Sequence, residues 1–382
     1  MSMPLRRIAS RIAACALLFL TAASHADVYS DWFEGKLGTW ASPPAGGQVR
    51  NLKFSHPAPP VSIIPPVIVK GLVLVEAKTG GQLKFKEYGA GTLHGPRDGF
   101  KAIREGLSDW ATCYAQFEGR GFEMSRVFEQ PFIAPVNPML ATMVAHDLAE
   151  KYFRPEFERQ ETYYGNMMAF SSADIMTKKP VRRLEDLRGM KVVAQGFPPD
   201  AARALGFSLV NIPYPEVYTA IQQGTVDAVI WYDAGFIPYK IYEVARFYTR
   251  LGISGSTLPT CINRKLFDGL APELKRTLYN VQQPLAMAMA KITQIEFGKK
   301  AADIYKEKGV EMIELAPAEL ERIKVAARQA VDKWVKDQEA AGRPGKQLLD
   351  DLAKSIAKFE KMGEDEMFRR AVEQPVPGLI KF

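Results

Sequence analysis

Three features of the sequence use residue types that carry out chemistry in other proteins, but none has the spacing that the chemistry requires. The glycine-rich segment 89–95 (GAGTLHG) follows a predicted strand, as a dinucleotide-binding loop does, but His94 stands where the third glycine belongs. The segment 252–256 (GISGS) ends in serine where a nucleophile elbow requires glycine. The histidines are scattered, and none has the HExxH spacing of a zinc protease. We therefore predict no catalytic residue, no metal site and no cofactor.

The most informative segment runs from 212 to 231 (IPYPEVYTAIQQGTVDAVIW). The pattern is typical of a strand end, a corner bounded by prolines, a helix that stops at Gly224, and a second strand that ends in an aromatic residue. Ligands bind beyond the carboxyl ends of strands in open parallel sheets. Trp231, Tyr232 and Asp233 are therefore expected at the rim of a cleft. From spacing alone, a core position is an equally good interpretation of Trp231.

The elements that must position these residues alternate along most of the chain. Strand patterns occur at 51–55, 83–88, 108–114, 191–194, 207–212 and 226–231, with helical patterns between them. From residue 271 onward the pattern is helical, at 271–308, 317–341 and 346–362. Alternating strands and helices predict the α/β class, with mainly parallel sheets covered by helices. A chain of 382 residues is too long for one compact core, so we expect two lobes.

The composition excludes several function classes. The chain is 47% hydrophobic and 24% charged, as an ordinary globular protein is. Its formal net charge of +7 includes three arginines within residues 1–26, and the remainder holds 47 basic and 43 acidic residues. These charges are interspersed, whereas nucleic-acid binding requires a clustered basic face. We therefore expect no nucleic-acid partner.

The first 26 residues have the three parts of a secretory signal peptide. Arginines within the first 11 residues precede an apolar stretch at 12–23, and small residues follow at Ser24 and Ala26. The apolar stretch is well short of the ~20 residues that span a bilayer. We predict cleavage between Ala26 and Asp27 and a periplasmic location. Residues 27–48, rich in glycine and proline near their end, are expected to form a flexible N-terminal lead.

Three blocks of the sequence resemble the solute-binding subunits of tripartite ATP-independent periplasmic (TRAP) transporters of the DctP type. The segment 213–228 (PYPEVYTAIQQGTVDA) is similar to the family pattern P-x-x-E-V-Y-x-A-L-Q-x-G-x-V-D-G. The other blocks are 74–88 (LVEAKTGGQLKFKEY) with 91–106 and 108–111, and 179–180 with 184–191 (LEDLRGMK). Their order and spacing extend the resemblance from about residue 51 to residue 351.

The resemblance implies a two-lobed periplasmic-binding-protein fold with a central cleft, whose lobes are bridged by crossovers and a long helix. Lobe 1 would comprise 49–169 plus about 277–316, and lobe 2 would comprise 170–276 plus about 317–382. The implied function is that of an extracytoplasmic receptor, which binds a small organic solute such as an organic acid. A TRAP-type membrane permease would accept the solute, and we expect the receptor to be a monomer.

The sequence departs from the family at the positions that grip the ligand. The family arginine that follows "G-L-K-I" is Val193 here, and a second arginine position falls near Ala173. The glutamate that binds a cation in some members is Ile230. We therefore expect the ligand not to be held by the usual arginine, and to be less acidic or partly apolar. Arg203 or Arg250 is an alternative source of the missing cation.

The residues expected to line the cleft come from both lobes. They are His56, Tyr114, Gln116 and Phe117 from lobe 1, and Val193, Gln195, Trp231, Tyr232, Asp233 and Ile253 from lobe 2. Aromatic rings would enclose the ligand, while Gln195 and Asp233 would set hydrogen-bond specificity.

Two cysteines remain after removal of the signal peptide, Cys113 and Cys261. An oxidising compartment permits a bridge between them, but the family topology implies different lobes, and a bridge between lobes would restrict closure. We therefore predict two free thiols. Two other functions stay open at this point, namely a sensor that presents its ligand to a membrane receptor, and a periplasmic enzyme.

Overall fold

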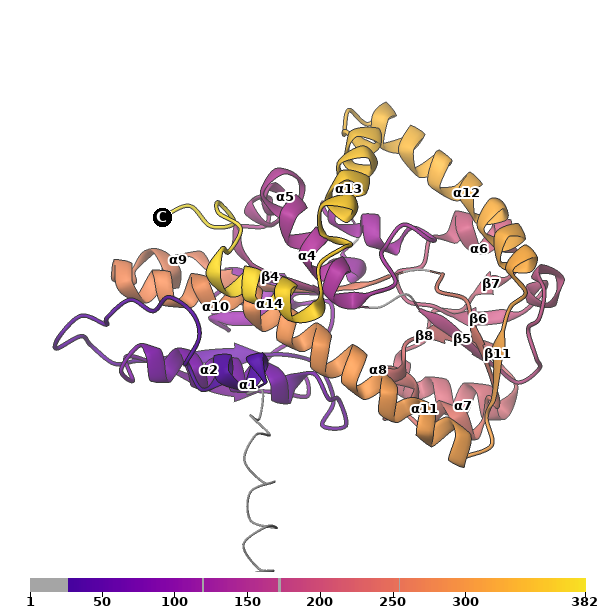
Figure 1. Cartoon of the computed structure of the whole chain (residues 1–382), viewed down its shortest axis with the longest axis horizontal. Coiled ribbons are helices and arrows are strands. Elements are labelled where there is room, and N and C mark those ends of the chain that lie inside the picture. Colours follow the sequence, from indigo (N-terminus) through magenta and orange to yellow (C-terminus); the bar gives the residue numbers. More distant parts are fainter. Residues whose placement is uncertain (1–26, 119, 171–172, 254) are drawn as a thin grey trace, which may run out of the picture.

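The computed structural model describes residues 27–118, 120–170, 173–253 and 255–382. The predicted signal peptide, residues 1–26, lies outside this range. The described chain forms two lobes, each built on its own sheet and flanked by helices (Figure 1), which confirms the predicted α/β class. In these ranges no helix is long and apolar enough to cross a bilayer.

The first lobe is built on a five-stranded sheet in the order β2-β1-β3-β10-β4. The parallel strands β1 (Arg50–Ser55), β2 (Leu83–Tyr88) and β3 (Trp110–Thr112) are connected by α2 (Pro65–Lys78) and α3 (Gly99–Arg104). β10 (Thr257–Asn263) pairs antiparallel with β3 and with β4 (Thr162–Ala169). The prolines at 65 and 66 suit the start of α2, because the first helical N–H groups have no partner within the helix.

The second lobe is built on a six-stranded sheet in the order β11-β9-β5-β8-β6-β7. Its strands are β5 (Asp174–Thr177), β6 (Lys191–Val193), β7 (Ser208–Leu209), β8 (Ala228–Trp231), β9 (Phe247–Arg250) and β11 (Glu311–Glu314). The crossover helices α6 (Pro199–Leu205) and α7 (Tyr214–Gln223) each end at a glycine with left-handed backbone, Gly206 and Gly224. Glycine adopts that conformation without a steric penalty, so both helices stop where the sequence predicts.

The shorter helices complete the chain between these strands. They are α4 (Pro138–Leu148), α5 (Arg154–Arg159), α8 (Asp233–Phe236), α9 (Arg264–Asp268), η1 (Ala115–Phe117), η2 (Ser125–Glu129), η3 (Ala149–Phe153), η4 (Leu184–Leu187) and η5 (Ile241–Glu243). α4 packs on β4, and its start is capped by Asn137, whose side chain accepts hydrogen bonds from two backbone N–H groups.

One strand in each sheet runs antiparallel to its neighbours, and the crossovers between lobes explain this. The chain leaves the first sheet at the end of β4 and enters the second as β5, and it leaves the second at the end of β9 and returns as β10. Each entering strand starts at the edge where parallel strands end, so it must run the opposite way. That shared edge of both sheets is the place where ligands bind in α/β folds.

The lobe boundaries differ from the predicted ones in both directions. Of the segment 277–316 assigned to lobe 1, β11 belongs to the second sheet. Residues 170–276 were assigned to lobe 2, but β10 lies between β3 and β4 with all seven of its residues buried. The segment 317–382 is also divided, because α13 (Gly345–Phe359) packs on α4 and α14 (Glu364–Glu373) packs on the long helix and α4. The second crossover returns the chain before residue 257, which a local pattern does not reveal.

A long helical run joins the lobes, as the sequence predicts. α10 (Pro272–Ala290), η6 (Lys291–Glu296) and α11 (Phe297–Glu307) follow one another without a break, with one wider turn at η6. α10 packs on β4 and α2 in the first lobe, whereas α11 packs on α8 and β11 in the second. Figure 1 shows this run crossing from one lobe to the other, and α12 (Pro317–Ala340) and α13 forming a second connection.

The N-terminal lead, expected to be flexible, begins with a packed helix, α1 (Val28–Phe33). The Trp32 side chain is fully buried, and the ring centroids of Tyr29 and Phe368 of α14 lie 4.3 Å apart. Lys78 also donates a hydrogen bond to the Gly35 carbonyl oxygen. The expectation was wrong because two aromatic residues of the lead complete the core of the first lobe.

The prediction of two free thiols is also contradicted. Cys113 and Cys261 are joined by a disulfide, with their Cα atoms 5.9 Å apart. The residues lie in the same lobe, because Cys261 belongs to β10 and Cys113 follows β3, its antiparallel neighbour. A bridge within one sheet does not restrict movement between lobes, so the argument against it no longer applies.

Candidate functional site

A small pocket lies at the junction of the two lobes, beyond the strand ends of the second sheet. Its wall is formed by the last residues of β8, by residues that precede β5 or follow β6, β7 and β8, and by the crossover into β10. They are Ala173, Ala194, Gln195, Phe197, Tyr214, Ile230, Trp231, Tyr232, Gly255 and Ser256. The wall thus combines aromatic rings, small residues and two neutral polar side chains.

Two stacked pairs of aromatic rings form the largest surfaces near this pocket. The rings of Trp231 and Tyr214 lie 3.6 Å apart between centroids, with 4° between their planes. The rings of Tyr232 and Phe170 lie 4.1 Å apart, with 5° between planes. Such pairs contribute roughly 0.5–1.5 kcal/mol beyond their buried area. They fix flat apolar surfaces in a defined position before a ligand arrives.

Tyr232 occupies the structural centre of the junction. Its side chain packs against all three hydrophobic clusters of the described chain, one in the first lobe and two on the faces of the second sheet. Phe170, its stacking partner, comes from the end of β4, so this stack joins the lobes through the first crossover. Burial raises the pKa of the Tyr232 phenol well above its usual value, so the hydroxyl stays neutral and able to donate.

Neutral polar groups supply the hydrogen-bonding capacity of the pocket. Gln195 donates through Nε2 to the carbonyl oxygen of Ile212, at 3.2 Å, which leaves its amide oxygen as an acceptor. Ser256 adds a hydroxyl from the second crossover. No charged side chain is among the lining residues that the described ranges contribute. A group that binds here meets dipoles rather than a formal charge.

Three of the ten predicted cleft residues line the pocket, and two more lie beside it. Gln195, Trp231 and Tyr232 line the pocket. From the first lobe, Tyr114 lies near Tyr232 and Gln116 lies against Gly196, so both are next to wall residues without lining the pocket themselves. The phenol of Tyr114 lies near those of Tyr232 and Tyr239, and burial raises its pKa to about 12.

Phe117 lies farther out, where the guanidinium of Arg97 sits over its ring at 5.4 Å from the centroid. The Phe117 ring also makes an edge contact with Tyr114. Phe117 therefore supports Tyr114 in this conformation and is not part of the pocket wall.

Four predicted residues point into other environments. His56 is buried, with Nε2 2.8 Å from Oε1 of Glu87, which belongs to β2. Val193 and Ile253 are fully buried in the hydrophobic clusters of the second lobe. Asp233 accepts a hydrogen bond from the Tyr305 hydroxyl of α11, at 2.8 Å, and burial raises its pKa to about 6. The structure does not bring these four residues into the pocket wall.

The positions at which the resemblance implies an arginine or a glutamate are apolar here, and two of them line the pocket. Ala173 and Ile230 both belong to the wall. Neither alternative arginine compensates, because Arg203 pairs with Asp200 on the surface of α6, and Arg250 pairs with Glu314 at 2.8 Å. Both arginine side chains are more than half exposed.

Several pocket residues were not predicted from the sequence. Tyr214, Phe197 and Ser256 line the wall, and Tyr214 lies 17 positions before the tryptophan on which it stacks. A usable signal was present, because Tyr214 starts the helix after β7, and residues that follow strands gather at one edge of the sheet.

The free space in the pocket is about 20 Å³, which is room for about one water molecule. The two lobes are thus packed closely together around the aromatic rings. A small organic molecule needs several hundred Å³, so a ligand can enter only when the lobes separate.

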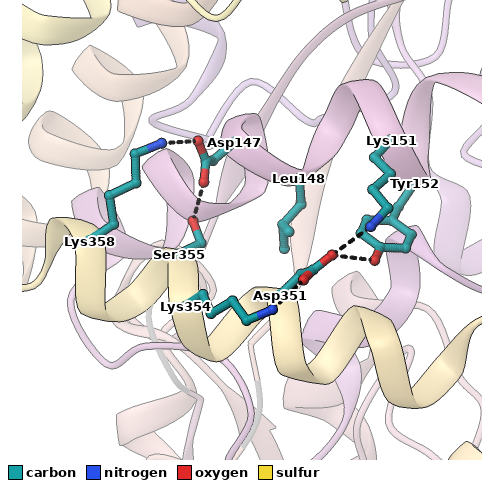
Figure 2. A pocket seen from close by; sticks show the side chains of 8 residues that line it. All are labelled: Asp147, Leu148, Lys151, Tyr152, Asp351, Lys354, Ser355 and Lys358. Carbon is teal, nitrogen blue, oxygen red and sulfur yellow. Dashed lines mark hydrogen bonds and ion pairs between the residues drawn. The ribbon is translucent and has the colours of Figure 1, made fainter.

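A larger hollow of about 250 Å³ lies elsewhere, between α4, η3 and α13 (Figure 2). The charged side chains of the hollow are engaged with neighbouring side chains. Asp351 accepts hydrogen bonds from Lys151, Tyr152 and Lys354. Asp147 accepts from Ser355 and Lys358, at 2.8 and 2.6 Å. These pairs fasten α13 to the first lobe, and they leave no charge in the hollow free to capture a ligand. The small junction pocket is therefore the candidate binding site.

Among the residues that the structure describes, no group of three or more histidine, cysteine, aspartate or glutamate side chains could hold a metal ion. The pocket wall itself contains none of these residue types.

Comparisons with known proteins show which family has this sequence and this fold. The model of the family described as bacterial extracellular solute-binding protein, family 7 (DctP), matches residues 54–338. The 2,3-diketo-L-gulonate-binding periplasmic protein YiaO of Escherichia coli (strain K12) is 27% identical over 254 residues, which cover 63% of this chain and 74% of that protein.

Solved structures share the fold at lower identity. A TRAP periplasmic solute binding protein from Desulfovibrio salexigens, described as an open complex, has a TM-score of 0.74 and 24% identity, covering 82% of this chain and 97% of that chain. A TRAP solute binding protein from Rhodoferax ferrireducens, in complex with copurified benzoate, has a TM-score of 0.75 and 21% identity, covering 82% and 99%. With three quarters of its length matched by the family model, the chain belongs to the DctP family of bacterial extracellular solute-binding proteins.

Proposed function

We propose that this protein captures a small organic acid with a single carboxylate and an apolar or aromatic body, and delivers it to a TRAP-type membrane permease. The observation that carries the proposal is the pocket wall, which joins stacked aromatic rings to neutral polar groups and contains no arginine. Binding would involve closure of the lobes without any chemical change in the ligand.

The contrast between one and two carboxylates follows from desolvation. A carboxylate that loses its water needs hydrogen bonds or a cation in return. Gln195, Ser256 and the tyrosine hydroxyls can serve one such group, whereas a second carboxylate would meet Ala173 or Ile230. Each charge-assisted hydrogen bond that is missing costs roughly 1.5–3 kcal/mol, or about tenfold or more in affinity.

Relatives are consistent with a ligand of this kind. The similar protein from Rhodoferax ferrireducens holds benzoate, an aromatic acid with one carboxylate, and the relative from Desulfovibrio salexigens was captured open. By analogy, the compact arrangement of this chain corresponds to the closed state, and the open state admits the ligand.

Calorimetry on refolded, ligand-free protein tests the proposal. We expect benzoate or another aromatic monocarboxylate to bind, and succinate, malate and fumarate to bind at least tenfold more weakly. The variant Ala194→Leu, which fills the small pocket, should abolish binding, and Ala340→Leu on the exposed face of α12 should not.

Tight, enthalpy-driven succinate binding that disappears in Arg203→Ala or Arg250→Ala would refute this reading of the pocket. It would mean that a surface arginine turns into the cleft and restores a carboxylate grip. If the proposal holds, neither substitution changes the affinity for any acid in the panel.

A further inference from the structure

An ion pair of the first lobe lies directly against the second lobe. Arg126 and Glu129 are both on η2, and Nε of Arg126 donates to Oε2 of Glu129 at 2.7 Å. The Glu129 side chain is only 6% exposed, while that of Arg126 is 34% exposed. The backbone of Gly196 lies against this buried carboxylate, within a segment whose residues Ala194, Gln195 and Phe197 line the junction pocket.

Gly196 is the point of contact. A Cβ atom built on it would lie 3.2 Å from Cδ and 3.3 Å from Oε1 of Glu129, and 3.4 Å from Cβ of Gln116. The two distances to Glu129 are shorter than ordinary van der Waals contact, and the distance to Gln116 is at its lower limit. A larger residue at this position would have to displace Glu129 by a few tenths of an ångström, and the φ of +81° favours glycine as well.

The same part of the first lobe is bonded to the second crossover. The carbonyl oxygen of Phe128, one residue before Glu129, accepts from the N–H of Gly255 at 3.0 Å. Gly255 lines the pocket, so Phe128 and Glu129 together touch two segments of its wall. The position of η2 is therefore coupled to the shape of the pocket.

We propose that Glu129 is a positioning residue for ligand capture: its carboxyl group packs on Gly196 only when the lobes close, so that protonation of Glu129 favours the closed state. This inference rests on the proposed function in taking closure of the lobes as the movement that captures the ligand. It does not depend on which ligand is bound.

The electrostatic surroundings of Glu129 support this dependence. Burial raises the pKa of Glu129 to about 7, although Arg126 opposes the shift. The neighbouring elements η1 and β10 and the segment 194–197 have no free ionisable side chain. The ionisable side chains of η3 are engaged elsewhere: Glu150 with Arg154, and Lys151 and Tyr152 with Asp351. Glu156 of α5 is a second buried carboxylate beside η2, with a pKa that burial raises to about 7, but it accepts hydrogen bonds from the N–H groups of Met124 and Ser125 at the other end of η2, at 2.7 and 2.9 Å.

The sign and size of the effect follow from linkage. In the open state water reaches Glu129, and its pKa returns toward the ordinary 4.5, whereas in the closed state it is about 7. A carboxyl group with the higher pKa in the closed state favours closure below that pKa, and the benefit is lost as the pH rises through 7. Between pH 8 and pH 6 the closed-to-open ratio should rise about tenfold.

Pulsed electron paramagnetic resonance on ligand-free protein measures this ratio directly. Spin labels at Lys101→Cys in α3 and Gln222→Cys in α7 occupy exposed sites, one in each lobe. The native cysteines are joined to each other, so they do not take up label. We expect the short-distance population of the otherwise wild-type protein to grow from pH 8 to pH 6. Glu129→Gln should show a high short-distance population that does not change with pH.

A pair of glycine variants tests the contact itself. Gly196→Ala adds a methyl group against Glu129 and Gln116, so it should shift the distribution to long distances at both pH values. Gly189→Ala is the matched control, because Gly189 has a similar φ of +75° and nothing within 4 Å of the added Cβ. It carries the same backbone strain in the same lobe without the contact, and it should behave as the wild type does.

Two results would overturn the inference. One is a pH response that persists in Glu129→Gln, and the other is a Gly196→Ala distribution equal to that of Gly189→Ala. If the labelled Glu129→Gln protein does not fold, as circular dichroism would show, the glycine pair still decides. Because no ligand is added, failure here is distinct from failure of the calorimetric test of ligand class.

Discussion

The disulfide between Cys113 and Cys261 should contribute much of the stability of the first lobe. Replacing both residues with alanine removes a link between positions 148 residues apart, in the middle of the sheet. Both cysteines are fully buried, on β10 and directly after β3. The substitution leaves the backbone hydrogen bonds between β3 and β10 in place, so we expect the variant to reach the native fold.

The expected magnitude comes from the length of the closed loop. In the chain-entropy model, a loop of about 150 residues restricts the unfolded state by roughly 5 kcal/mol, and native disulfides typically contribute 2–5 kcal/mol. Loss of the sulfur atoms also leaves a small cavity, at a further ~1 kcal/mol. We expect the double alanine variant to lose at least 3 kcal/mol of unfolding free energy.

Urea unfolding with and without a thiol reductant measures this contribution. Reductant should lower the transition midpoint of the wild type to about that of the Cys113→Ala/Cys261→Ala variant. It should leave the variant unchanged, which controls for effects of the reductant on the rest of the molecule.

Counting thiols under denaturing, non-reducing conditions is the measurement that could refute this prediction. The structure requires no free thiol in the mature chain. Two reactive thiols per molecule, or a wild-type midpoint that reductant does not move, would show that the cysteines are only neighbours.

Two further predictions concern the second lobe and export. Val193→Arg should lower the unfolding free energy by about 3–5 kcal/mol without adding affinity for dicarboxylates, because the guanidinium would replace a fully buried side chain packed among apolar residues such as Val217. Lys191→Arg, at the exposed start of the same strand, is the control. Equal urea midpoints for the two variants would contradict the prediction. Mass spectrometry of the protein from a periplasmic extract should find Asp27 at the N-terminus, and an intact Met1 on the bulk of the protein would contradict the predicted cleavage.

Local elements were predictable because their signals are local. α2 begins at the proline pair 65–66, and α6 and α7 stop at Gly206 and Gly224. These boundaries depend on backbone preferences of the residues themselves. The order of the blocks likewise indicated the DctP family, which the family model confirms.

The site was predicted only in part. Trp231, Tyr232 and Gln195 follow strands of the second sheet, and a strand end lies at the ligand edge whatever the rest of the fold does. Val193 and Ile253 also lie at strand ends, but a strand alternates its side chains between two faces. Neither is in the pocket wall, since both side chains lie within the apolar clusters of the second lobe.

The sequence by itself determined the class of fold, several helix boundaries and the absence of arginine at positions 173 and 193, since each of these depends on residue type and short-range spacing. Only the tertiary structure decided which strands are neighbours. The placement of β10 beside β3 brought Cys261 to Cys113 across 148 residues, and the packing of the lobes brought Glu129 onto Gly196. Such contacts form between segments far apart in the chain, where the gain from burying both surfaces outweighs the entropy of closing the loop, and no local pattern encodes them.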